Sequence, residues 1–323
     1  MADMPILDLD RVGLFYTESP GGTEAAPTLL LVHGWGGAGD QWCTLLPHLA
    51  PAATGRVIVP DLRGHGASRS QWTDEDWRGG TVRAADFTPR AFAADLARLL
   101  AELRTGPVIA VGHSMGGQVV TALAVEHPAS VSALVVLDPA YGADDEELVR
   151  IPGEQDALRA EGAAWAARFV AGAFSARAAL GQPEREQRLM AATDVRVLAA
   201  ARDGMYLAPD AFGTRAATAA YLARCAAPTL AIYSSTPAAD WYRAHGSRHP
   251  ESMVEVIADV GHYLQLENSR AVAELINRFA ARIAAESSRH SGPAAANAGP
   301  SSAGGTSCTA RDISSRPPSP TSA

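Results

Sequence analysis

Short runs rich in valine, isoleucine and leucine restrict the fold of this chain more than any other feature. They are apolar throughout rather than alternating with polar residues, which is typical of parallel strands buried on both faces. The runs cover residues 28–32, 56–59, 107–111, 131–137 and 228–233, and residues 253–258 are predicted to form a further strand. Longer segments with helical periodicity separate them, so the sequence predicts an α/β fold with a mostly parallel sheet flanked by helices.

Three helices are predicted between or after these strands. One begins at Thr88-Pro89, where a threonine N-cap precedes a proline at the first helical position. The others are expected over residues 114–126 and 268–285. Together they supply helices for both faces of the sheet.

Residues 141–226 interrupt the alternation of strands and helices. A crossover between parallel strands needs only about a dozen residues, so a longer segment without strands indicates an insertion. We expect a helical lid, or cap, at 141–226, inserted between the strands at 131–137 and 228–233, while residues 1–140 and 227–286 form one α/β domain. The helical segments of this cap are expected at residues 154–173, 183–200 and 211–224. Such a cap would lie over the carboxyl ends of the strands, where open α/β sheets bind ligands.

Residues 287–323 differ in composition from the rest of the chain. They are mostly serine, alanine, proline and glycine, and Ile313 is their only large aliphatic residue. A segment of this kind cannot bury enough apolar surface to offset the entropy lost on ordering, so it is predicted to be a disordered tail. The alternative is a short motif around Arg316–Pro320 that docks a proline-recognising partner.

Charge and cysteine content exclude several classes of partner and site. The net charge is -8, with 27 basic residues, all arginine, against 35 acidic ones, which argues against binding to nucleic acid. The three cysteines, Cys43, Cys225 and Cys308, are odd in number and far apart, so reduced thiols are expected rather than a disulfide framework or a metal site. Without a secretory signal or a membrane-spanning run, the sequence predicts a cytoplasmic protein that does not associate with membranes. A homodimer is compatible with the sequence.

Residues 112–117 read Gly-His-Ser-Met-Gly-Gly, directly after a predicted strand and directly before a predicted helix. G-x-S-x-G in this context is typical of a sharp turn that exposes a serine nucleophile. Gly112 and Gly116 would let strand and helix approach closely, and the helix start would offer N–H groups to a developing oxyanion. Ser114 is therefore the predicted nucleophile, and the alternative is a glycine-rich packing turn.

Over about residues 11–286 the sequence resembles the α/β-hydrolase fold family, and among its members bacterial aryl esterases and cofactor-free haloperoxidases. Residues 31–36, Leu-Val-His-Gly-Trp-Gly, and residues 61–68, Asp-Leu-Arg-Gly-His-Gly-Ala-Ser, also fit the family pattern. The resemblance implies that the backbone N–H groups of Trp35 and Met115 form an oxyanion hole. It also implies a mainly structural role for the loop containing His65, and chemistry that needs neither a metal nor an organic cofactor.

The general base and the acid must follow the serine in this family's chain order. His262, in Asp-Val-Gly-His-Tyr at 259–263, occupies the family's usual position for the base. The acid usually follows the strand at 228–233, but there the chain reads Ser-Ser-Thr-Pro. Asp138, at the end of the strand at 131–137, is the favoured acid; Asp240 and an incomplete triad are the alternatives.

These residues predict a serine hydrolase that cleaves a small hydrophobic ester or lactone through a Ser-His-Asp triad and an acyl-enzyme. The partner would be a small hydrophobic molecule. Alternatives on the same scaffold are a haloperoxidase-like perhydrolase, a carbon–carbon bond hydrolase, or a weakly active relative that binds a ligand. Aromatic and methionine side chains could line the substrate pocket or form the core of the cap: Trp72, Trp77, Trp165, Phe169, Phe174, Met205, Tyr206 and Phe212.

Overall fold

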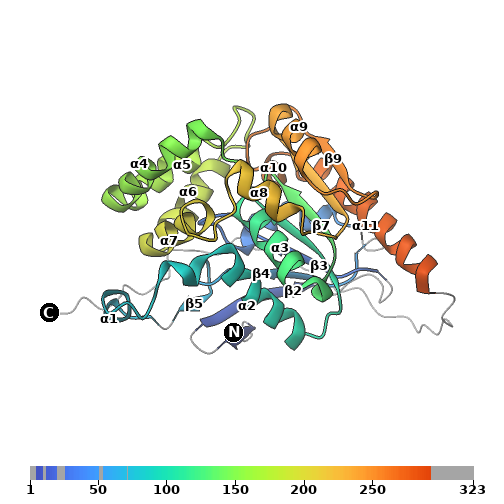
Figure 1. The fold of residues 1–323 in the computed structure, drawn as a ribbon, viewed down its shortest axis with the longest axis horizontal. Coiled ribbons are helices and arrows are strands. Elements are labelled where there is room, and N and C mark those ends of the chain that lie inside the picture. The colour runs from blue at the N-terminus through green and yellow to red at the C-terminus, as the bar shows by residue number, and fades with distance from the viewer. Residues whose placement is uncertain (1–4, 10–11, 20–25, 51–53, 71, 292–323) are drawn as a thin grey trace.

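A nine-stranded sheet runs through the centre of the molecule (Figure 1). The computed structural model describes residues 5–9, 12–19, 26–50, 54–70 and 72–291. The strands are Ile6–Leu9 (β1), Val12–Ser19 (β2), Leu29–Val32 (β3), Val57–Pro60 (β4), Arg69–Ser70 (β5), Val108–His113 (β6), Val131–Leu137 (β7), Thr229–Tyr233 (β8) and Met253–Val256 (β9). Their order is β1-β2-β4-β3-β6-β7-β8-β9, and β5 pairs with β2.

Strands β3, β4 and β6 to β9 pair in parallel, as predicted. The fold class, a mostly parallel sheet flanked by helices, is confirmed. The sequence did not reveal β1, β2 and β5, which join antiparallel at one edge. Strand β2 mixes buried and exposed positions, because an antiparallel strand can have one face on the core and the other in solvent. It therefore lacks a continuous apolar run.

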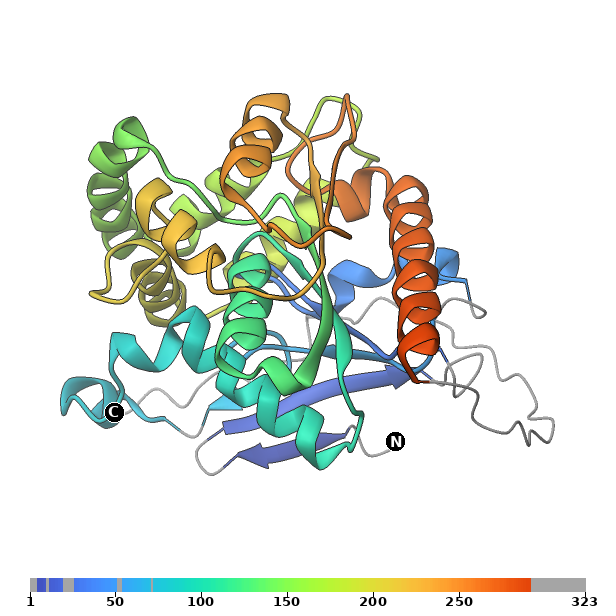
Figure 2. The same ribbon diagram turned by 45° about the vertical axis from the view of Figure 1, so that its right-hand side comes forward.

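Each face of the sheet has its own hydrophobic cluster. Leu30 and Val32 of β3 belong to one cluster, whereas Leu29 and Leu31 belong to the other, because successive side chains of a strand point to opposite faces. Helices Pro89–Glu102 (α2) and Met115–Glu126 (α3) cover the first face, and Ser269–Ser291 (α11) covers the second (Figure 2). This burial on both faces explains why β3 is apolar at every position and why β6, β7 and β8 are mostly apolar.

Five helices lie between β7 and β8 in the sequence: Asp145–Glu161 (α4), Ala163–Ala171 (α5), Gln182–Ala192 (α6), Val195–Tyr206 (α7) and Arg215–Leu222 (α8). We call residues 145–222 the cap; α4 to α7 group together at one end of the molecule (Figure 1). The helix expected at 154–173 is in fact two, separated by Gly162 at a φ of 61°. The one expected at 183–200 is divided at Thr193 and Asp194, and the one at 211–224 is shorter. The division of the chain into two domains and a tail stays a prediction.

Three short helices lie outside the cap: Asp74–Arg78 (α1), Thr236–His245 (α9) and Leu264–Glu267 (α10). The segment after β8, expected to be a loop, is α9, which starts with a proline in its first turn. Helix α11 runs through Ser291, so residues 287–291 are helical rather than part of the disordered tail. The rest of the expected tail, with its proline-rich motif, lies outside the described residues.

Two cysteines belong to the described part of the chain. Cys225 is a free, buried thiol, but Cys43 is disulfide-bonded, so the expectation of reduced thiols throughout was wrong. The spacing of cysteines along a sequence does not report their distance in space.

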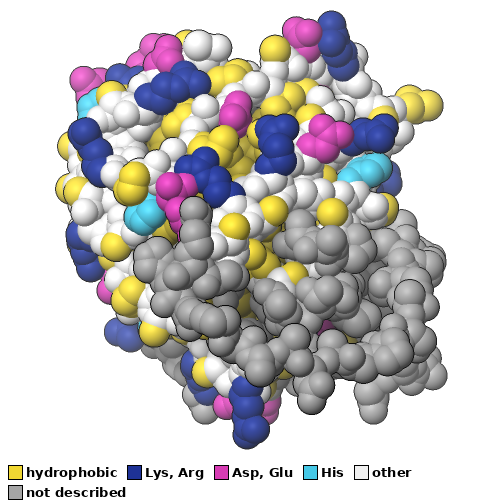
Figure 3. Space-filling model, turned by 90° about the vertical axis from the view of Figure 1, so that its right-hand side faces the viewer, with side chains coloured by type: hydrophobic (Ala, Val, Ile, Leu, Met, Phe, Trp, Pro, Cys, Tyr) yellow, Lys and Arg dark blue, Asp and Glu magenta, His cyan; other side chains and the backbone are white. Residues whose placement is uncertain are grey.

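None of the described helices is both long and apolar enough to cross a membrane. On the face that looks out from the α11 side of the molecule, arginine and acidic side chains are intermixed over the described surface (Figure 3).

Candidate active site

Ser114 lies in a sharp turn between β6 and α3. Its backbone has a φ of 53° and a ψ of -118°, a strained conformation that costs about 1–3 kcal/mol in a residue with a side chain. The turn is possible only because glycines surround it. A Cβ at Gly112 would lie 2.2 Å from the carbonyl oxygen of Gly116, and a Cβ at Gly116 would lie 2.3 Å from that of Val32. The motif therefore adopts the strand–turn–helix geometry that the sequence predicted.

Backbone hydrogen bonds align the ends of three neighbouring strands. The Ser114 N–H donates to the carbonyl of Leu137 at 3.0 Å, and the Asp138 N–H donates to the carbonyl of Ile232 at 2.9 Å. The parallel ladder thus continues past the last residues of β6 and β7. As a result the predicted nucleophile, Ser114, and the favoured acid, Asp138, lie together at the carboxyl ends of the parallel strands.

Asp138 faces the predicted base. Its side chain is 10% exposed, and its Oδ2 lies 3.5 Å from Nδ1 of His262. Ser234, the first residue after β8, donates to the same carboxylate twice, from its N–H to Oδ1 at 2.8 Å and from its hydroxyl to Oδ2 at 2.5 Å. Sequence reasoning noticed Ser234 only as part of the segment after β8 that lacks a carboxylate, and it missed these two bonds to Asp138.

The alternative acid lies elsewhere. Asp240 is on α9, its side chain is 63% exposed, and it forms an ion pair with Arg243 at 2.6 Å. An exposed carboxylate already paired within its own helix is poorly placed to orient a histidine. The structure brings Asp138 to His262 and does not bring Asp240 there.

His262 occupies the loop between β9 and α10, and its side chain is 35% exposed. The ring of His113, which precedes Ser114, lies 4.7 Å from the His262 ring, and its Nε2 donates to the His262 carbonyl at 2.9 Å. Burial, and then the nearby His262, lower the pKa of His113 well below its ordinary value. His113 therefore stays neutral beside His262, the predicted base, whose side chain is partly exposed.

Two further histidines lie behind the site and are completely buried. Burial lowers the pKa of His33 to about 4 and that of His65 to about 3. His33 donates from Nδ1 to the Gly34 carbonyl and accepts at Nε2 from the Leu62 N–H, so its tautomer is set by backbone partners. Both rings are neutral near pH 7 and hold the loops together.

The loop expected to carry the oxyanion hole packs against the nucleophile. A Cβ at Gly34 would lie 3.3 Å from the Cβ of Ser114, so the two turns are in close contact. Trp35 follows, is 7% exposed, and donates from its indole N–H to the carbonyl of Leu198 in the cap at 2.9 Å. Met115 is the first residue of α3, where a backbone N–H has no acceptor within the helix.

Comparison with known families agrees with this geometry. The family described as alpha/beta hydrolase fold matches residues 27–269. The chain belongs to the alpha/beta hydrolase fold family. The recognition made from the motifs around Ser114, Trp35 and Asp61 is thereby confirmed.

Among curated hydrolase relatives, the lipase LipV of Mycobacterium tuberculosis is 36% identical over 157 residues, which is 45% of this chain and 54% of the lipase. Other curated relatives match over about a third of their own length. A thermophilic esterase from Thermogutta terrifontis superposes with a TM-score of 0.68 at 24% identity, covering 87% of this chain and 97% of the esterase. A bromoperoxidase from Bacillus anthracis gives a TM-score of 0.69 at 19% identity, covering 85% and 98%.

The hydrolase site is bordered by apolar side chains of the cap. A Cβ at Gly36 would lie 2.0 Å from the sulfur of Met190, and the ring of Phe169 meets Trp35 edge-on at 5.7 Å. Other candidate pocket residues lie elsewhere: Phe212 stacks on Tyr221, and Trp72 and Trp77 pack on Phe87.

Residues of α7 also line a pocket of about 360 Å³, and none of the predicted catalytic residues lines it. Trp77 of α1 and Arg196 of α7 are among its walls. Within the described residues, no group of three or more His, Cys, Asp or Glu side chains could hold a metal ion.

Proposed function

We propose that this protein is a serine hydrolase that cleaves small hydrophobic carboxylic esters or lactones. The observation that carries the proposal is the approach of Asp138 to His262 at the strand edge where the strained Ser114 turn lies. A nearly buried carboxylate, a half-buried histidine and a half-buried serine on a tight turn are the parts of an acyl-transfer triad.

In this mechanism the Ser114 hydroxyl attacks the ester carbonyl while His262 accepts its proton. Asp138, whose Oδ2 lies 3.5 Å from Nδ1 of His262, holds the ring in the correct tautomer and stabilises the imidazolium that forms. The N–H groups of Trp35 and Met115 stabilise the oxyanion of the tetrahedral intermediate. His262 then gives its proton to the leaving alcohol, and an acyl-enzyme forms on Ser114. Water activated by His262 releases the acid and restores the serine.

The surroundings of the oxyanion loop favour an apolar acyl or alcohol group. Met190, Leu198 and Phe169 of the cap contact this loop, and each offers apolar surface. The likeness to relatives named as a lipase and an esterase supports an ester-like bond as the target.

The test is turnover of p-nitrophenyl butyrate by the wild type and by Ser114→Ala, together with labelling of Ser114 by a fluorophosphonate. We expect wild-type turnover and covalent labelling, both abolished in Ser114→Ala, because the serine is the only nucleophile in the mechanism. A folded wild type that neither hydrolyses short esters nor reacts with the fluorophosphonate contradicts the proposal. That result favours a ligand-binding role for the site.

A further inference from the structure

The cap contacts both loops that the proposed mechanism needs. On the oxyanion side, the carbonyl of Leu198 in α7 accepts the indole N–H of Trp35 at 2.9 Å. The amide of Gln41 donates to Glu186 of α6 at 2.5 Å. Burial raises the pKa of Glu186 and Gln41 supplies its donor, so this bond lies in the interior rather than on the surface. Two cap helices therefore hold the segment that contains the predicted oxyanion hole.

On the histidine side, the cap binds the backbone of the base itself. The N–H of His262 donates to the carbonyl of Ala173, in the connection between α5 and α6, at 2.8 Å. The carboxylate of Glu267 accepts from the N–H of Gly261 at 3.1 Å and from the hydroxyl of Ser175. Glu267 thus joins the cap to the histidine loop.

Close packing leaves little freedom at the same contact. A Cβ at Gly261 would lie 2.5 Å from the backbone nitrogen of Ser175. The ring of Phe174 stacks on Tyr263 with centroids 4.5 Å apart and planes 4° from parallel. The contact therefore combines hydrogen bonds with aromatic packing on both sides of His262.

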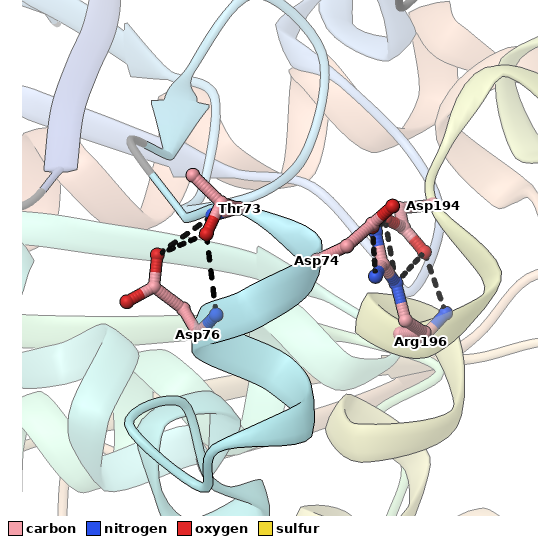
Figure 4. A network of polar contacts seen from close by, with 5 residues as sticks. All are labelled: Thr73, Asp74, Asp76, Asp194 and Arg196. Atoms are coloured by element: carbon pink, nitrogen blue, oxygen red, sulfur yellow. Dashed lines mark hydrogen bonds and ion pairs between the residues drawn. The ribbon is translucent and has the colours of Figure 1, made fainter. Parts of the chain in front are cut away.

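A third contact ties the start of α7 to α1, away from the catalytic loops. Arg196 binds Asp194 and Asp74 (Figure 4). Its guanidinium lies over the Trp77 ring, 5.1 Å from the centroid. These side chains are largely exposed, so the ion pairs contribute little to stability. They nevertheless connect the cap to the body of the protein on its outer edge.

A swing of the whole cap away from the sheet would break the buried bonds on both sides at once. The indole of Trp35 and the carboxylate of Glu186 would exchange their partners across this contact for water, which does not hold the oxyanion loop in one position. The histidine loop would lose the acceptor that fixes the His262 backbone. An open cap would therefore leave both loops without support at the moment of catalysis, when their geometry must be held within about 0.5 Å.

We propose that the cap stays docked through turnover and positions the oxyanion and histidine loops, so that the site takes individually dissolved ester molecules rather than ester at a lipid–water surface. This inference rests on the proposed function. In this arrangement Trp35 contributes through two groups. Its backbone N–H stabilises the oxyanion, and its indole is a positioning group held by Leu198.

The substrate form is tested by measuring the rate against tributyrin concentration across its solubility limit, with p-nitrophenyl butyrate as a fully dissolved reference. We expect saturation below the limit and no increase when droplets appear. A sharp rise in rate at the limit overturns the inference, because it shows that a surface opens the cap. If dissolved esters are not hydrolysed and Ser114 is not labelled, the proposed function fails instead, so the two failures are distinguishable.

The positioning role is tested with Trp35→Phe, which keeps an aromatic ring and removes the indole N–H. We expect kcat to fall about tenfold with KM and the melting temperature almost unchanged, since one buried hydrogen bond aligns the oxyanion loop. Trp77→Phe is the matched control, because Trp77 contacts the outer edge of the cap and should keep wild-type kcat. Equal kcat values for wild type and Trp35→Phe remove the assigned role of Trp35.

The closed cap is tested by joining Ser175→Cys and Glu267→Cys with a short reagent that links two thiols. The linked protein should hydrolyse p-nitrophenyl butyrate at least as fast as the same double variant before linking. Loss of activity on linking, regained when a cleavable linker is cut, shows that the cap must open and overturns the inference.

Discussion

The ends of β7 and β8 lie side by side at the edge of the sheet, yet they carry different chemistry. β7 is followed by a carboxylate, Asp138, whereas β8 is followed by Ser234, whose N–H and hydroxyl act as donors. Both donors of Ser234 bind that carboxylate, and the carboxylate faces His262. The comparison shows that the end of one strand can hold in place a carboxylate that belongs to the end of its neighbour.

The largest effect is expected from Asp138→Asn. The amide is nearly isosteric but favours the wrong tautomer of His262 and cannot stabilise its imidazolium, so kcat should fall by about 10⁴. The measurement is the steady-state hydrolysis of p-nitrophenyl butyrate, with circular dichroism to verify the fold. An unchanged kcat in a folded variant excludes Asp138 as the acid.

A smaller effect should follow when the acid is moved to the other strand end. Ser234→Asp in the Asp138→Asn background places a carboxylate next to the amide at residue 138, one strand away from its original place. A new charge-assisted hydrogen bond to His262 is worth about 1.5–3 kcal/mol, so kcat should recover on the order of tenfold to a hundredfold relative to Asp138→Asn. No recovery shows that only the end of β7 can supply the acid.

Removing one hydrogen-bond donor of Ser234, the residue after β8, should lower kcat less than the loss of Asp138. Ser234→Ala deletes the hydroxyl bond to Asp138 but leaves the backbone N–H bond, so kcat should fall about tenfold while KM changes little. Ser235→Ala is the matched control, because the exposed neighbour makes no side-chain capping bond to α9. A Ser234→Ala enzyme indistinguishable from Ser235→Ala argues that the backbone alone positions the acid.

What could be predicted from the sequence follows from the range of the interactions involved. The strands and the Ser114 turn could be predicted from short stretches of sequence. Burial on both faces requires apolar runs, and the close approach at positions 112 and 116 requires glycine. The hydrogen bond from Ser234 to Asp138 joins residues far apart in the chain, and no short sequence pattern predicts it.

The cap shows the same limit. The bond of Trp35 to Leu198 spans much of the chain, and which cap residue would meet the oxyanion loop has no local signature. Gly162 separates α4 from α5, because its positive φ ends the first helix. The sequence shows a glycine at this position, but a glycine in an alanine-rich stretch does not by itself predict a positive φ.

The smallest effect belongs to Asp240, the residue that the sequence left as an alternative acid. The segment expected to be a loop is α9, and its helical geometry turns Asp240 toward Arg243 on the exposed side. Because an exposed ion pair of this kind contributes about 0–1 kcal/mol, Asp240→Asn should keep kcat within about twofold of wild type and lower the melting temperature only slightly. The assay is the same ester hydrolysis, run beside Asp138→Asn. A loss in Asp240→Asn comparable to that in Asp138→Asn would mean that α9 rearranges to bring its carboxylate to His262, and it would reverse the comparison between the two strand ends.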